Sequence, residues 1–203
     1  MIRLSRLALA AVAILFGLYH ALLGFLFLGE YQNPAFAIVG LIAYLSALLL
    51  ATFDKSGLKM RAVSAAIVLI VSISLPQLIF AALGEVRQGS YTTWHIAAIG
   101  TLLAIVTIRK FAVLAWIALA VTSLQVIEWG GADVIFNSGL VGALLLVATA
   151  QAASWALGSS SKSAEEFRRR ALAIDTATAA SSAARTERTE RLNQTLKEVL
   201  PLL

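Results

Sequence analysis

The sequence predicts an all-α membrane protein: a polytopic bundle of about six transmembrane helices followed by a long C-terminal cytoplasmic helix. Of its 203 residues, 60% are hydrophobic and only 13% are charged, and the mean hydropathy is +0.86. Soluble domains carry about 25% charged residues. A soluble core of this size cannot bury such an apolar excess, so we expect the bilayer to act as the solvent for residues 1–157.

Apolar segments recur along residues 1–157. A helix that crosses a bilayer needs about 20 apolar residues, within a range of about 17–25. The fourth segment is short, and only Arg109–Lys110 separates it from the fifth. Together they are too long for one crossing, so we expect a turn at this dipeptide. The predicted spans are 7–28, 35–53, 62–83, 93–108, 111–128 and 134–157.

The first segment also has to be tested as a signal peptide, because "MIRLSR" precedes its apolar run. The apolar part of a cleavable signal is about 7–15 residues long. This run is longer, and the small-residue motif at Ala35–Ala37 lies beyond a polar loop. We therefore expect an uncleaved first span.

Nearly all cations that flank the predicted spans lie on one side. The loops on the other side hold Arg87 alone. The positive-inside rule then predicts that both termini lie in the cytoplasm. This also explains the net charge of +5 without a nucleic-acid partner. The cations on the predicted inner side are Arg3, Arg6, Lys55, Lys59, Arg61, Arg109, Lys110, Lys162, Arg168, Arg169 and Arg170.

A carboxylate lies at the predicted outer end of the first, third and fifth spans: Glu30, Glu85 and Glu128. The first two follow the same Leu-Gly pair, which is compatible with three similar helical hairpins. The other interpretation is that Gly and Glu simply end membrane helices. Trp94 and Trp129 fall at the predicted outer ends of spans four and five, where interfacial aromatics are common.

No Asp, Glu, Lys or Arg lies in the middle of a predicted span. Ion-coupled pumps, proton relays and voltage sensors place charges there. Uncharged polar residues gather instead toward the outer half, and Pro76 precedes one of them as a predicted hinge. One hypothesis is an outward-facing ligand pocket; the other is hydrogen bonding between helices. The candidates are His20, Gln77, His95, Gln125 and Asn137.

Several kinds of chemistry are disfavoured. The chain has no cysteine, which excludes thiolate catalysis, disulfides and Fe–S clusters. A haem could be held by His20 and His95, but nothing else in the sequence marks a cofactor site. A histidine that titrates with external acidity is a further possibility. We predict no catalytic residue, no metal site, no cofactor and no enzymatic activity.

After residue 157 the chain becomes polar. "GSSSKS" at 158–163 is expected to be a linker, and Ser163 with Glu166 forms a capping box that predicts a helix over 164–203. At its end, apolar residues follow the 4-3-4 spacing of a coiled coil. An amphipathic helix lying on the membrane or on the bundle is the alternative. The predicted dimer seam is Leu192, Leu196, Val199 and Leu203.

The stretch "RTERTERLNQTLKEVLPLL" behind several short spans resembles the membrane-spanning N-terminal input region of actinobacterial-type sensor histidine kinases. The tail has no histidine to accept a phosphate and no nucleotide-binding motif, so the kinase domains are not represented. The resemblance implies a sensor module in a bacterial plasma membrane. It would form a homodimer through the C-terminal helix and pass a stimulus to a cytoplasmic kinase domain or another soluble partner.

Two other functions fit the same features. One is a small solute permease or channel whose polar residues line a path. The other is a membrane scaffold that docks a soluble partner through its C-terminal helix.

Overall fold

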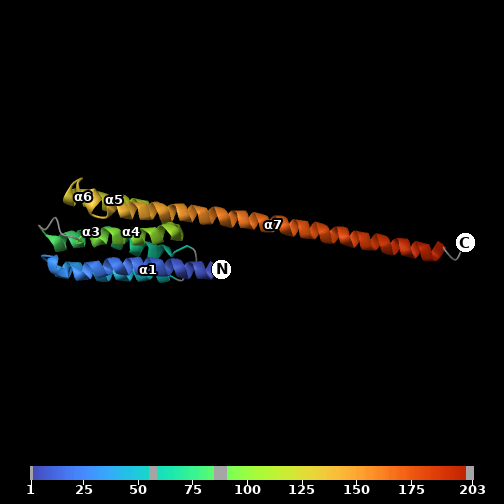
Figure 1. Ribbon diagram of the computed structural model, residues 1–203, viewed down its shortest axis with the longest axis horizontal. Coiled ribbons are helices and arrows are strands. Elements are labelled where there is room, and N and C mark those ends of the chain that lie inside the picture. Colours follow the sequence, from blue (N-terminus) through green and yellow to red (C-terminus); the bar gives the residue numbers. More distant parts are fainter. Residues whose placement is uncertain (1, 55–58, 85–90, 200–203) are drawn as a thin grey trace. The chain divides into compact units, whose positions relative to one another are not determined.

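The computed structural model describes residues 2–54, 59–84 and 91–199, and every regular element in them is helical (Figure 1). Side chains are described from residue 11 to residue 193 within these ranges. The chain divides into two units, Met1–Ser154 and Trp155–Leu203, which are taken in turn. The predicted all-α class is confirmed for the described residues.

The first unit is a bundle of apolar helices. The described stretches Pro34–Phe53, Ala62–Leu83, Trp94–Gly130 and Leu140–Asn193 are each long and apolar enough to cross a membrane, and Ala11–Leu26 is a shorter apolar helix. The elements are α1 (Ile2–Leu26), η1 (Leu28–Glu30), α2 (Pro34–Phe53), α3 (Ala62–Leu83), α4 (Trp94–Val106), η2 (Thr107–Phe111), α5 (Ala112–Gly130), α6 (Val134–Asn137) and α7 (Leu140–Val199).

The stretch Trp94–Gly130 is interrupted where the sequence predicts a turn. Arg109 (φ −82°, ψ 20°) and Lys110 (φ 75°, ψ 20°) leave the helical region of the backbone. A positive φ is uncommon for a residue with a side chain, so Lys110 marks a real change of direction. The helices on its two sides, α4 and α5, pack against each other.

Helix α4 forms the core of the first unit. It contacts α1, α2, α3 and α5, and eleven of its thirteen residues are buried. A helix that is apolar on all sides is suited to such a position. Because its neighbours surround it, α4 does not have to match the hydrocarbon thickness, which accounts for the short fourth segment.

The predicted sixth span, 134–157, is not one continuous helix. The short α6 ends at Asn137, and Gly139 adopts a φ of +89°, a conformation that costs glycine little. Helix α7 begins only at Leu140.

The predicted linker at 158–163 is wrong. Residues 158–163 are helical and belong to α7, so Ser163 does not start a new helix. A capping box is a local signal, and here the helix already under way from Leu140 overrides it. The serines are tolerated because their hydroxyls can bond to the preceding turn, as Ser161 does to the Gly158 carbonyl at 2.9 Å.

In the second unit, Trp155–Leu203, the described residues belong to the remainder of α7. Exposed ion pairs between residues four apart support it, at Glu165–Arg169, Glu166–Arg170 and Glu187–Arg191. Each such pair contributes about 0.3–0.5 kcal/mol. Of the predicted seam, Leu192 is exposed. The side chains of Leu196 and Val199, and all of Leu203, lie outside the described residues.

Candidate functional site

At each end of the first unit, contacts of the loops hold neighbouring helices together. At one end, which we call the Tyr31 end, Tyr31 Oη donates to the Thr92 carbonyl at 2.9 Å, and Trp94 Nε1 donates to Tyr31 Oη at 3.1 Å. The backbone amide of Asn33 donates to the Ala82 carbonyl at 3.0 Å. These bonds join the α1–α2 connection to the end of α3 and the start of α4. Tyr31 was not singled out from the sequence.

Trp94 occupies a different environment from the one predicted. It lies at a helix end, but it is buried rather than placed at a lipid interface. Its indole covers Gly24 so closely that a Cβ there would come within 2.5 Å of the ring, and it meets the Tyr44 ring edge-on at 5.6 Å. Trp129 is partly buried and stacks on Phe80 at 4.5 Å.

The two histidines have separate surroundings. His20 is buried in α1, and its Nδ1 donates to the Phe16 carbonyl on the preceding turn at 2.8 Å. His95 is completely buried in α4, beside the edge of Phe80 and the backbone of Thr92. Neither ring nitrogen of His95 makes a hydrogen bond of good geometry to a described residue. The bond to its own helix accounts for the polar side chain of His20.

Gln77 and Asn137 are exposed on α3 and α6, and so are the carboxylate residues Glu30 and Glu128. Glu85 lies outside the described residues. The apolar cavity described below is lined by neither of the two histidines and by neither Gln77 nor Asn137. A common pocket for the five candidate residues therefore stays a prediction.

Gln125 has a structural partner one turn before the proline of α3. Its Nε2 donates to the Ile73 carbonyl of α3 at 3.1 Å, three residues before Pro76. A proline within a helix removes one backbone hydrogen bond and disturbs the preceding turn, and in a membrane neighbouring side chains, ordered waters or local adjustments of the helix satisfy the freed groups. This contact supports the interpretation that Gln125 bonds between helices.

At the opposite end, which we call the Arg109 end, a buried ion pair joins the end of α2 to the connection between α4 and α5. Arg109 donates from Nη2 to the Asp54 carbonyl at 3.0 Å and lies 3.4 Å from Asp54 Oδ1. The Asp54 side chain is 2% exposed and that of Arg109 is 17% exposed. The Arg109 carbonyl in turn accepts from the Met60 amide at 3.3 Å. The sequence identified Arg109 only as a loop cation and did not identify its partner.

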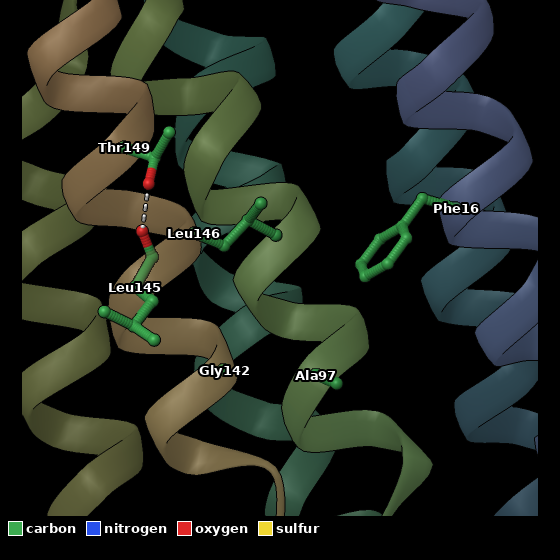
Figure 2. A pocket seen from close by; sticks show the side chains of 6 residues that line it. All are labelled: Phe16, Ala97, Gly142, Leu145, Leu146 and Thr149. Carbon is green, nitrogen blue, oxygen red and sulfur yellow. Dashed lines mark hydrogen bonds between the residues drawn. The ribbon is translucent and has the colours of Figure 1, made fainter.

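An apolar cavity of about 280 Å³ opens between α1, α4 and α7. Figure 2 shows Phe16 of α1 pointing across it toward α4 and α7. The hydroxyl of Thr149 is already bonded to the Leu145 carbonyl at 2.7 Å, so the lining presents no polar group in need of a partner. It suits hydrocarbon rather than a polar ligand. The lining residues are Phe16, Ala97, Gly142, Leu145, Leu146 and Thr149.

Within the described residues, no three His, Asp, Glu or Cys side chains gather in a way that holds a metal ion. The contacts that do stand out are structural: Tyr31 with Thr92 and Trp94, Gln125 with α3, and Asp54 with Arg109. No protein-family model, no curated protein and no solved structure matches the chain.

Proposed function

We propose that this chain is a multi-pass sensor module of a bacterial plasma membrane, which relays an external or membrane stimulus to a cytoplasmic helix. The observation that carries the proposal is the continuity of α7. This helix begins at Leu140 beside the apolar core and continues to Val199, through the polar residues 158–163. A helix that is unbroken through residues 158–163 is suited to carrying a shift or rotation from a membrane to a soluble partner.

In this proposal the first unit crosses the bilayer six times. The crossings are α1, α2, α3, α4, α5 and the first part of α7. The cationic segments around Lys59–Arg61 and Arg109–Lys110 share the Arg109 end, which is supported by the bond between Met60 and Arg109. By the positive-inside rule this end faces the cytoplasm. Both termini are then cytoplasmic, and the Tyr31 end faces outward.

The contact of α7 with the core would receive the stimulus. Gly100 of α4 lies directly against Ala143 of α7. A change in the packing around α4 would move α7 at this contact, and the movement would reach the second unit along the helix. The output would be a change in how two copies of the C-terminal helix pair along Leu192, Leu196, Val199 and Leu203.

The likeness of the tail to the input regions of sensor histidine kinases supports this assignment. The chain itself contains no phosphoacceptor histidine in its tail, so a kinase domain or another soluble protein would perform the chemistry. We propose no catalytic role for the chain.

Disulfide crosslinking in native membranes tests the proposal, and the absence of natural cysteines makes every introduced cysteine informative. Single cysteines at Leu192, Leu196 and Val199 should crosslink two copies. Gln194 and Glu198 lie off the seam of the same helix and serve as matched controls, with little crosslinking expected. If all five positions crosslink equally, or if no seam position does, the dimeric output helix is refuted.

A membrane scaffold is the second candidate. It is favoured by Phe167 and Ile174, which lie two turns apart and are both exposed in the second unit. In that case the tail would bind a soluble protein rather than a second copy. Replacing both residues with serine would then abolish binding of that protein. Cysteines at the predicted seam would not crosslink two copies, even without these replacements. A permease has less support, because the described cavity is apolar.

A further inference from the structure

Hydroxyl groups in the apolar helices are mostly satisfied by their own backbone. Each donates to the carbonyl four residues earlier, which is the usual arrangement for Ser and Thr inside helices. The bonds measure 2.7–2.8 Å for Thr52, Ser72, Thr107, Ser123 and Thr149. A hydroxyl bonded in this way needs no further partner.

Thr122 of α5 departs from this pattern. Its side chain is 1% exposed, and its Oγ1 has no hydrogen-bond partner among the residues that the structure describes. Thr122 lies near the middle of α5, about 12 Å from the last residue of the helix at a rise of about 1.5 Å per residue. Lipid offers no hydrogen bond at such a depth.

A second buried polar atom lies on the same side of α5. Gln125 Nε2 donates to the Ile73 carbonyl, but Gln125 Oε1 has no partner in the described part of the chain. Residues three apart on a helix are neighbours on one face. Thr122 and Gln125 therefore place an unused donor and an unused acceptor on one face of α5, from which Gln125 reaches α3.

The facing turn of α3 supplies a third group. Pro76 has no amide hydrogen, so the Ser72 carbonyl, four residues earlier, has no donor at position 76. Ser72 is completely buried. Because the Gln125 amide reaches the adjacent carbonyl of Ile73, this turn of α3 lies within reach of α5.

We propose that the α3–α5 interface holds a water molecule beside the turn of α3 that precedes Pro76. The water accepts a hydrogen bond from Thr122 Oγ1 and donates to Gln125 Oε1 and to the Ser72 carbonyl. Three such bonds are typical of a buried water. The water would supply a partner to Thr122 Oγ1, to Gln125 Oε1 and to the carbonyl that Pro76 leaves without its helical donor, and it would join α3 to α5. This holds whether or not the chain is a sensor.

Replacing Thr122 with valine tests the proposal, because the two side chains have the same shape. If the interface is dry, the variant loses only an unpaired hydroxyl, and the unfolding temperature should stay the same or rise. If the water is present, the variant removes the hydrogen bond that the water accepts, and loss of the water leaves Gln125 Oε1 and the Ser72 carbonyl without their donor. The unfolding temperature should then fall by several degrees. Thr107→Val is the control: Thr107 is equally buried, but its hydroxyl bonds to the Leu103 carbonyl.

The expected result is a larger fall for Thr122→Val than for Thr107→Val. Adding Gln125→Leu to Thr122→Val should then lower the unfolding temperature by less than the sum of the two single changes. An unchanged or raised unfolding temperature for Thr122→Val overturns the proposal. A second measurement uses the unaltered protein: NMR in detergent micelles should show magnetisation transfer from water to the Thr122 methyl group and none to that of Thr107. Equal transfer to both, or none to Thr122, also overturns it.

Discussion

Gly100 of α4 lies so close to Ala143 of α7 that a Cβ added to residue 100 would come within 2.7 Å of the Ala143 Cα. Helices inside a membrane gain no hydrophobic free energy by associating, so they depend on close backbone contact at small residues. This contact holds the start of α7 against the core helix of the first unit.

Gly100→Ala should weaken that contact. The added methyl group meets backbone rather than a flexible side chain, so α4 and α7 have to separate. Inserting a methyl into a tightly packed interior costs about 1–3 kcal/mol. We expect a lower unfolding temperature in detergent micelles, measured by the loss of helical circular dichroism or by the onset of aggregation.

Gly142→Ala is the matched control, because it changes the same residue type close to the same contact. A Cβ at position 142 meets no atom within 4 Å. Alanine is favoured over glycine within a helix by about 1 kcal/mol, so this variant should be as stable as the unaltered chain or more so. Equal losses for the two variants would show that the α4–α7 contact is not tight.

The ion pair at the Arg109 end leads to a second prediction. Asp54→Asn removes the negative charge that faces Arg109 but keeps the size of the side chain. Because Asp54 is almost fully buried, the change breaks a buried ion pair by removing one of its charges, and such losses cost about 3–5 kcal/mol. The partial exposure of Arg109 places the expected loss at the lower end of that range. Thermal unfolding of the purified protein measures it.

Glu166→Gln provides the comparison for this pair. It also removes a carboxylate that faces an arginine, Arg170, but both side chains are exposed on α7. Exposed pairs contribute well under 1 kcal/mol. A stability loss for Asp54→Asn as small as that of Glu166→Gln would mean that Asp54 and Arg109 do not form a buried pair.

Helix positions were the most predictable part of the fold. The predicted segments 35–53 and 62–83 match α2 (Pro34–Phe53) and α3 (Ala62–Leu83) closely. Pro34 suits the first turn of a helix, and charged or polar residues flank both segments. The interruption at Arg109–Lys110 was predictable for a similar reason, since two adjacent cations are costly within an apolar run.

The faces of these helices were not predictable. In a soluble helix, polar residues mark the side away from the core, but here both lipid and protein are apolar. Hydropathy therefore did not separate α4, which is buried on all sides, from its neighbours. Gln77 and Gln125 looked equivalent in the sequence, yet one is exposed and the other bonds to Ile73. The hydrogen bond that distinguishes them joins two residues that are 52 positions apart in the sequence.

The two histidines give a third prediction. His95 is completely buried, and its ring nitrogens make no hydrogen bond of good geometry to a described residue. Replacing it with phenylalanine removes polar atoms that burial penalises, so the unfolding temperature should change little. His20→Phe should lower it, because Nδ1 loses the Phe16 carbonyl. If His95→Phe is the more damaging of the two, His95 makes a polar interaction that the described residues do not supply.

Tyr31 gives a prediction about alkaline stability. Burial raises the pKa of Tyr31 to about 12, against an ordinary value of about 10. The folded state therefore favours the neutral phenol. The contribution of this phenol to the free energy of unfolding is complete below about pH 10 and is lost as the pH rises toward about 12.

Tyr31→Phe should be less stable at neutral pH by about 1–3 kcal/mol, since the Thr92 carbonyl and Trp94 Nε1 lose a partner. The stability of this variant should also fall less steeply between about pH 10 and 12. Tyr91→Phe, at an exposed residue, should follow the unaltered chain. Unfolding measured across this pH range in micelles tests the prediction, and parallel profiles for all three proteins would contradict it.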